Sequence, residues 1–103
     1  MQKYRYTIIW KGTEAVNIVK RATAGTLESS DAYVEIEPAS ELTVKIESVV
    51  EKQFGEKIDF AVRDVLNSLG VEGASVRVVD RGALECVIRA RVETAVKRCG
   101  GDL

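Results

Sequence analysis

Strict alternation between apolar and polar residues, in two neighbouring stretches, limits the fold of this chain more than any other feature. Residues 32–37 and residues 42–47 each place an apolar side chain at every second position. A period of two is typical of a strand with one buried face. Residues 22–28 and 74–79 predict two further strands, the first of them weakly patterned. The predicted inward-facing residues are Val34, Ile36, Leu42, Val44, Ile46, Val76 and Val78.

A helical period replaces the alternation between residues 48 and 70. Ser48 and Glu51 have the spacing of a capping box, which predicts a helix with Ser48 as its N-cap. Gly70 can adopt the left-handed conformation that ends many helices, whereas Gly55 weakens the helix by about 1 kcal/mol relative to alanine. The predicted apolar stripe comprises Phe54, Ile58, Ala61, Val62, Val65, Leu66 and Leu69.

A second helix is predicted from an N-cap at Asp80 to about Arg98, ended by the two glycines that follow. The acidic and basic residues on its polar face are spaced for i,i+4 ion pairs. These pairs are Glu85–Arg89, Arg89–Glu93 and Glu93–Lys97. The predicted apolar stripe comprises Leu84, Val87, Ile88, Arg91, Val92 and Ala95, with the stem of Arg91 at its edge.

The predicted order of elements is strand, strand, strand, helix, strand, helix, within a chain of 103 residues. This length is that of one domain. We therefore expect an α+β fold: a single two-layer domain with a mainly antiparallel sheet of about four strands and two helices on one face. Tyr4, Tyr6, Ile8 and Trp10 alternate with Arg5, Thr7 and Ile9, which is compatible with an additional N-terminal edge strand.

Composition excludes several classes of function. A net charge of −1 and a pI near 5.5 provide no basic field for nucleic acid or an anionic membrane. The absence of histidine removes Ser-His-Asp and Cys-His machinery. Cys86 and Cys99 lie in one predicted helix, roughly 20 Å apart, too far for a disulfide, and lack the spacing of a metal site. No secretory signal pattern or apolar membrane segment is present, so we expect a soluble cytoplasmic protein.

Three segments, in order, resemble one family. Residues 24–31 read AGTLESSD, residues 48–55 read SVVEKQFG and residues 82–91 read GALECVIRAR. They are similar to the modification motif and the two helix starts of citrate lyase acyl carrier proteins, the gamma subunits. The resemblance covers residues 16–99, which gives a carrier domain at 16–103 and an extension at 1–15. Because typical members lack this extension, we hypothesise that residues 1–15 are a translated leader and that Val16 corresponds to the usual start.

The resemblance implies that Ser29 carries 2′-(5″-triphosphoribosyl)-3′-dephospho-CoA through a phosphodiester. That group would bear acetyl and citryl thioesters for the cleavage of citrate to oxaloacetate and acetate. The chain would be a non-catalytic carrier whose partners are the alpha (acyl transferase) subunit, the beta (citryl lyase) subunit and a cofactor-attaching transferase. The flanking motif residues are Gly25, Thr26, Leu27, Glu28, Ser30 and Asp31.

Several roles remain open near this motif. Many relatives have glycine where this chain has Ser30, so two adjacent hydroxyls compete as the acceptor. Glu28 and Asp31 are candidates for binding a metal or orienting the transferase, although such residues usually only solvate a turn. Three arginines are candidates for holding cofactor phosphates or partner carboxylates. They are Arg81, Arg89 and Arg91.

Alternative functions come from the same class and from another. The acyl carrier (delta) subunit of malonate decarboxylase uses the same prosthetic group, and a citramalate lyase carrier would differ only in its partner subunits. A small α+β binding module for nucleic acid would need a basic sheet face that bears aromatic residues. Tyr33 is the only aromatic residue in the predicted strands after Thr23, which argues against that module.

Overall fold

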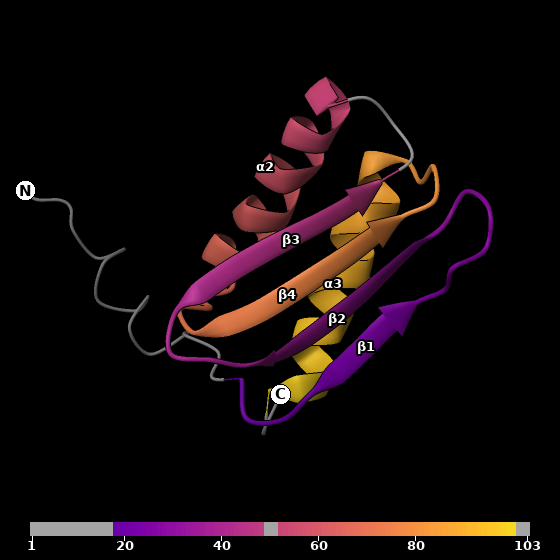
Figure 1. The fold of residues 1–103 in the computed structure, drawn as a ribbon. Helices are drawn as coiled ribbons and strands as arrows, with labels where there is room; N and C mark the ends of the chain where they lie inside the picture. The colour runs from indigo at the N-terminus through magenta and orange to yellow at the C-terminus, as the bar shows by residue number, and fades with distance from the viewer. Residues whose placement is uncertain (1–17, 49–51, 101–103) are drawn as a thin grey trace, which may run out of the picture.

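The computed structural model describes residues 18–48 and 52–100 of the chain (Figure 1). Its elements confirm the predicted order of three strands, a helix, a strand and a helix. They are β1 (Ala22–Gly25), β2 (Ala32–Pro38), β3 (Leu42–Ser48), α2 (Lys52–Ser68), β4 (Ala74–Asp80) and α3 (Glu85–Cys99). The predicted N-terminal strand around residues 4–10 and the domain boundary at residue 16 lie outside the described residues.

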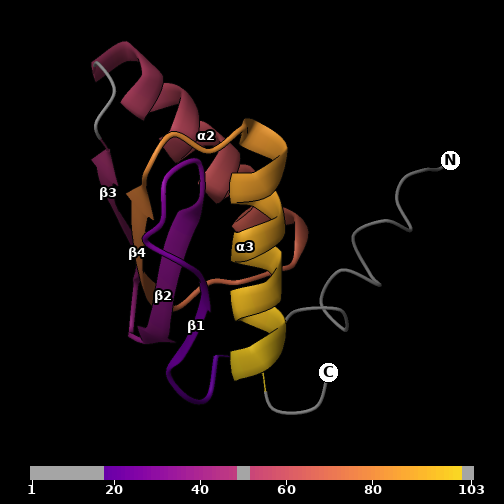
Figure 2. The ribbon, with the colours of Figure 1, turned by 90° about the vertical axis from the view of Figure 1, so that its right-hand side faces the viewer.

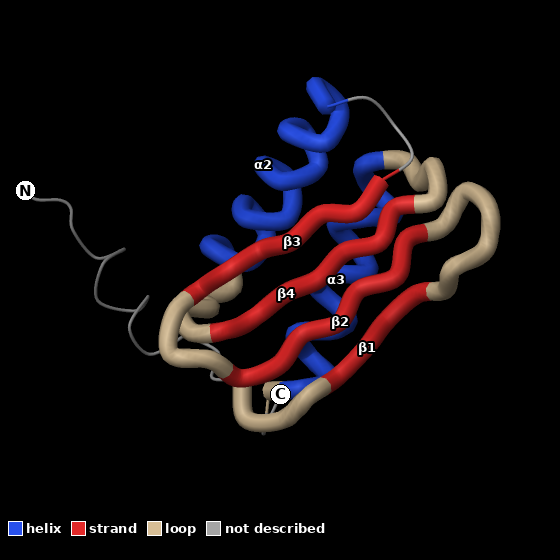
Figure 3. The backbone as a smooth tube through the Cα atoms, in the orientation of Figure 1, coloured by secondary structure: helices blue, strands red, loops and turns tan. Residues whose placement is uncertain are grey.

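The sheet has four strands in the order β1-β2-β4-β3, so β4 lies between two strands that are consecutive in the chain (Figure 3). Strand β2 pairs antiparallel with both β1 and β4, whereas β3 pairs parallel with β4. A parallel pair needs a crossover connection, and helix α2 provides it as the middle of a β-α-β unit. The expectation of a mainly antiparallel sheet is therefore confirmed, with one parallel pair at the β3 edge.

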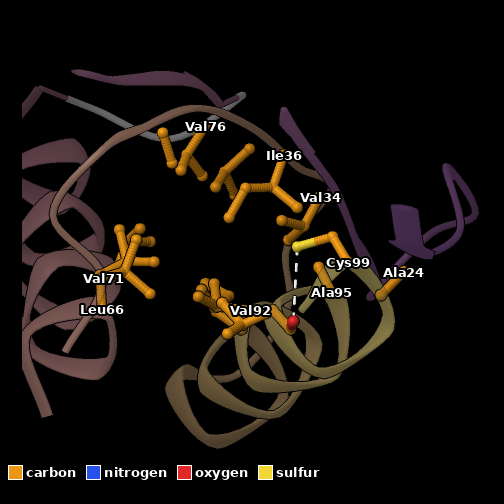
Figure 4. Packing of buried hydrophobic residues seen from close by; sticks show 14 of the residues in the cluster. Ala24, Val34, Ile36, Leu66, Val71, Val76, Val92, Ala95 and Cys99 are labelled. Carbon is orange, nitrogen blue, oxygen red and sulfur yellow. Dashed lines mark hydrogen bonds between the residues drawn. The ribbon is translucent and has the colours of Figure 1, made fainter. Parts of the chain in front are cut away.

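Both helices cover the same face of the sheet, as predicted (Figure 2). The inward-facing residues of the strands meet the buried stripes of the helices in one core, shown in Figure 4. Cross-strand partners such as Val34 and Val78 are fully buried because their side chains share this inner face. The core also includes Val71, which follows α2.

Helix α2 ends as the sequence predicts. Gly70 has a φ of 75°, and its N–H donates to the carbonyl of Asn67 at 3.1 Å. The N–H of Val71 donates to the carbonyl of Leu66 at 3.0 Å. These two bonds form a Schellman motif, which satisfies carbonyls that the helix itself leaves unpaired. At the other end, Ser48 is the last residue of β3, and its predicted capping partner Glu51 lies outside the described residues.

The start of α3 corrects the prediction of an N-cap at Asp80. Asp80 is the last residue of β4, and its Oδ1 accepts the N–H groups of Gly82 and Ala83 at 3.1 and 2.9 Å. The carboxylate therefore caps the loop and not the helix. The helix begins only at Glu85, and its N-cap residue, Leu84, makes no side-chain hydrogen bond to it. A positive φ of 95° at Gly82 reverses the chain before a helix can form.

The apolar stripe of α3 is also displaced from the prediction. Leu84 is 71% exposed because it precedes the helix in an extended conformation, whereas Arg91 lies at the edge of the stripe as predicted. The buried stripe instead continues to the last residue, Cys99, whose Sγ donates to the carbonyl of Val96 at 3.4 Å (Figure 4). Both cysteines are free, as predicted, and burial raises the pKa of the Cys99 thiol. The residues buried on α3 are Ile88, Val92, Ala95, Val96 and Cys99.

Two of the three predicted ion pairs on α3 form. Glu85 binds Arg89 at 2.8 Å, and Glu93 binds Lys97 at 3.0 Å. Arg89 directs its other donor to Asp64 on α2, at 2.8 Å, instead of to Glu93. Neither helix, within the described residues, is long and apolar enough to cross a membrane.

Candidate modification site

A tight turn lies at the tip of the loop between β1 and β2. The N–H of Asp31 donates to the carbonyl of Glu28 at 3.1 Å, so Ser29 and Ser30 are its two central residues. Among the described residues other than glycine, Ser30 alone has a positive φ, of 69°. A positive φ at the second central position only is typical of a type II turn. The turn presents Ser29 at an exposed position, and it confirms the polar turn predicted at this point.

The carboxylate of Asp31 holds this turn in place. Arg91 of α3 donates from Nε to Oδ1 at 3.0 Å and from Nη2 to Oδ2 at 3.2 Å. Thr26 Oγ1 donates to Oδ2 at 2.7 Å, and the N–H of Ala32 donates to Oδ1 at 2.7 Å. The loop closes further where Thr26 Oγ1 accepts the N–H of Glu28 at 3.2 Å.

These bonds set the charge state of Asp31. Its side chain is only 15% exposed, and the Arg91 hydrogen bonds, followed by those from Thr26 and Ala32, hold the pKa of this carboxyl well below its usual range. A carboxylate so fully bonded has little capacity left for a metal ion. Among the described residues, no group of three or more potential metal ligands gathers anywhere.

The turn is also tied to the loop between β4 and α3. Ser30 N–H donates to the carbonyl of Arg81 at 2.8 Å, and Arg81 N–H donates to the carbonyl of Asp31 at 2.9 Å. The turn is thus fixed on two sides, by the side chain of Arg91 and by the backbone of Arg81. Ser29 immediately precedes the two anchored residues, Ser30 and Asp31.

Gly25 makes the close entry into this loop possible. Its φ is 89°, and a Cβ atom there would lie 1.8 Å from the carbonyl oxygen of Ala32. No residue with a side chain can occupy that position without moving the backbone of β2. The same geometry ends β1 at Gly25, so the predicted strand over residues 22–28 is three residues too long.

Ser29 has an exposed hydroxyl, and no described residue beside it is placed to activate that hydroxyl. Neither its hydroxyl nor that of Ser30 bonds to another described residue, and the nearby carboxylate of Asp31 is committed to Arg91 and Thr26. A weak nucleophile of this kind needs an external base before it reacts. The geometry suits a residue that is modified by another enzyme, and it leaves space for a large adduct.

The three arginines proposed as anion ligands differ in their availability. Arg91 is bound to Asp31, and Arg89 is bound to Glu85 and Asp64. The guanidinium of Arg81 is exposed and has no ion-pair partner among the described residues. The sequence did not reveal the pairing of Asp31 with Arg91, because 60 positions separate the two residues.

Comparisons with known proteins agree on the kind of protein. A family model described as the malonate decarboxylase delta subunit matches residues 19–99. A citrate lyase acyl carrier protein of Haemophilus influenzae strain PittEE is 53% identical over 83 residues, covering 81% of this chain and 87% of that protein. The chain belongs to the citrate lyase acyl carrier protein family. The citrate lyase acyl carrier protein 2 of Salmonella typhimurium strain LT2 is 52% identical over 85 residues, covering 81% of this chain and 88% of that one.

The fold of this family member also occurs in a larger assembly. A chain in the crystal structure of a Pseudomonas malonate decarboxylase hetero-tetramer in complex with malonate superposes with a TM-score of 0.72 at 21% identity. The match covers 84% of this chain and 92% of that one. At this identity the likeness concerns the fold. The resemblance stated from the three motifs is confirmed by the identities near 50%.

Proposed function

We propose that this chain is the acyl carrier subunit of citrate lyase and that Ser29 bears 2′-(5″-triphosphoribosyl)-3′-dephospho-CoA through a phosphodiester. The observation that carries the proposal is the position of Ser29, exposed at the tip of an anchored turn, in a chain 53% identical to a citrate lyase acyl carrier protein. The prosthetic group, when bound, supplies the thiol that carries acetyl and citryl groups while citrate is cleaved to oxaloacetate and acetate.

The residues around Ser29 fit such a group. Residues 26–30, which form the tip of the loop, are all exposed, and Gly25 allows the loop to leave β1 in close contact with Ala32. The anchored turn keeps the attachment point in one place, so that only the arm need move between active sites. Asp31 and Arg91 neutralise each other, which avoids an unpaired carboxylate beside the phosphodiester.

Ser29 is the better acceptor of the two adjacent serines. The N–H of Ser30 is bound to the carbonyl of Arg81, so its backbone faces the β4–α3 loop. Ser29 makes no such backbone hydrogen bond with a described residue, and it occupies the first central position of the turn. A cofactor-attaching transferase would reach the Ser29 hydroxyl with the least disturbance of the loop.

The proposal includes partners and a location. We expect the alpha (acyl transferase) and beta (citryl lyase) subunits to receive the arm in turn, in a cytoplasmic complex. The carrier itself would contribute attachment and positioning, without catalysis.

A second candidate is the delta subunit of malonate decarboxylase, which the description of the matching family model and the fold of the Pseudomonas chain favour. A citramalate lyase carrier differs from our proposal only in its partners. Reconstitution distinguishes these candidates. If our proposal is correct, this carrier will support the turnover of citrate when it is combined with the alpha and beta subunits of citrate lyase.

The attachment is tested by intact mass and peptide mapping after co-expression with the cofactor-attaching transferase and the cofactor precursor. We expect a mass increase equal to the adduct, mapped to Ser29 and absent from Ser29→Ala.

Ser30→Gly is the matched control for this experiment. Glycine favours the positive φ at position 30, so the turn is retained while the second hydroxyl is removed. We expect full modification of this variant. Loss of the adduct in Ser30→Gly together with its retention in Ser29→Ala would show that Ser30 is the acceptor.

A further inference from the structure

A groove of about 250 Å³ opens between the first half of α2 and the loop that connects β4 to α3. Its walls are mainly apolar. Phe54 lies at this groove and is 45% exposed. The first residue of the predicted apolar stripe of α2 is therefore not buried in the core. The main lining residues are Phe54, Lys57, Ile58, Ala61, Ala83 and Ile88.

The groove lies at the same end of the molecule as Ser29. Figures 1 and 2 show the β1–β2 loop, the β4–α3 loop and the beginning of α2 together at this end. The β4–α3 loop is bonded to the turn on one side, where the backbone of Arg81 forms hydrogen bonds with the backbone of Ser30 and Asp31. The next two residues, Gly82 and Ala83, line the groove. A single loop of backbone therefore separates the attachment point from the groove.

The charged side chains at the groove differ in whether they have bonding partners. The carboxylate of Asp80 accepts Ser48 Oγ at 2.9 Å and two backbone N–H groups, and Glu85 binds Arg89. The ammonium of Lys57 lies 5.7 Å from the ring centroid of Phe54 and makes no ion pair with a described residue. The groove thus combines apolar walls with the positive charge of Lys57, which pairs with no carboxylate among the described residues.

We infer that this groove receives the acyl-bearing end of the arm attached at Ser29. The inference rests on the proposed function. A volume of about 250 Å³ is below the usual range of sites that enclose a whole ligand of drug size, so the groove fits the slender thioester end and not the nucleotide. Lys57 would bind a carboxylate of a citryl group, and the apolar walls would keep water from the thioester.

Nuclear magnetic resonance of the apo chain and of the acylated, modified chain tests this placement. Intact mass first establishes that the arm and the acyl group are attached. We expect nuclear Overhauser effects between arm protons and the methyl groups of Ile58 and Ala61, on the α2 wall of the groove. The methyl of Ala74 serves as the reference, because it lies at the opposite end of β4, about 20 Å from Asp80.

Two pairs of variants test the contacts. Phe54→Ala removes an apolar wall, and Phe60→Ala is its control, a 67% exposed residue of the same helix outside the groove. Lys57→Gln removes the charge, and Lys45→Gln is its control on the exposed face of β3. We expect hydroxylamine to cleave the acetyl thioester about threefold faster in Phe54→Ala than in the wild type. Lys57→Gln should accelerate cleavage of the citryl thioester more than that of the acetyl thioester, and both controls should match the wild type.

The outcomes separate the two proposals. An unchanged mass with an active transferase overturns the attachment at Ser29 and the groove assignment with it. A correct mass without arm-to-groove contacts overturns the groove assignment alone. Shifts of the groove residues that appear only on addition of the alpha or beta subunit would overturn it too, and would show that the groove binds a partner subunit.

Discussion

Asp31 shows how one side chain organises the candidate site. Its carboxylate joins the β1–β2 loop to α3 through Arg91 and closes the loop through Thr26. The sequence placed Asp31 correctly in a polar turn, but it offered solvation, metal binding or orientation of the transferase as its roles. Only the packing of α3 beside β1 and β2 brings Arg91 within bonding distance. The residue is therefore structural, and it fixes the position from which Ser29 is presented.

The low pKa of Asp31 predicts a specific pH dependence of stability. Because the folded pKa lies below the ordinary value of about 3.9, the unfolded chain binds a proton at a higher pH than the folded chain does. The stabilisation is complete above the unfolded pKa and is lost as the pH falls toward the folded pKa. We expect Asp31→Asn to lower Tm most at neutral pH, with a difference that shrinks below about pH 4.

Glu28→Gln is the control for this titration. Glu28 is exposed in the same loop, and its carboxylate bonds to no other described residue, so its substitution should change Tm little at any pH. Thermal unfolding followed by circular dichroism at a series of pH values measures both variants. A Tm difference for Asp31→Asn that stays constant down to acid pH would show that the Arg91 pair does not stabilise the fold.

At the scale of the element, the hairpin of β1 and β2 depends on Gly25. Alanine at this position would need a positive φ and would meet the carbonyl of Ala32. We expect Gly25→Ala to lower the free energy of unfolding by more than about 1 kcal/mol, as measured by urea denaturation. It should also reduce modification at Ser29, because the loop must shift to relieve the clash.

A second glycine provides a control of opposite sign. Gly55 lies inside α2, where an added Cβ meets nothing within 4 Å. Gly55→Ala should raise the free energy of unfolding by about 0.5–1 kcal/mol, since alanine is the better helix former. If both variants changed stability in the same direction, the special conformation of Gly25 would not be the reason for its effect.

Element types were predictable from the sequence, whereas several element ends were not. Period-two and helical patterns identified all six described elements, because each pattern reflects one buried face. The start of α3 was wrong because Asp80 bonds to the following loop, and a capping aspartate looks the same in sequence whether it caps a loop or a helix. The end of β1 depended on the φ of Gly25, which hydrophobic periodicity does not report.

At the scale of the whole molecule, stability rests on the single layer of side chains between sheet and helices. Leu66 is fully buried in this layer, next to Val71 (Figure 4). We expect Leu66→Ala to lower the free energy of unfolding by about 2–5 kcal/mol, because it leaves a cavity in a well-packed core. Phe60→Ala, at a residue 67% exposed on the same helix, should change it by no more than about 0.5 kcal/mol. Equal losses from the two substitutions in urea denaturation would contradict this position of the core.

The sequence by itself determined the order of elements, the buried faces of the strands, most of the buried stripe of each helix, and the polar turn that contains Ser29, since these depend on local patterns and short motifs. The tertiary structure alone decided that β4 lies between β2 and β3, that Arg91 holds Asp31, and that a groove opens beside the turn that contains Ser29. These features join residues far apart in the chain. Strand order, ion-pair partners and cavities depend on how complete faces pack, and packing is a property of the folded molecule that no local pattern contains.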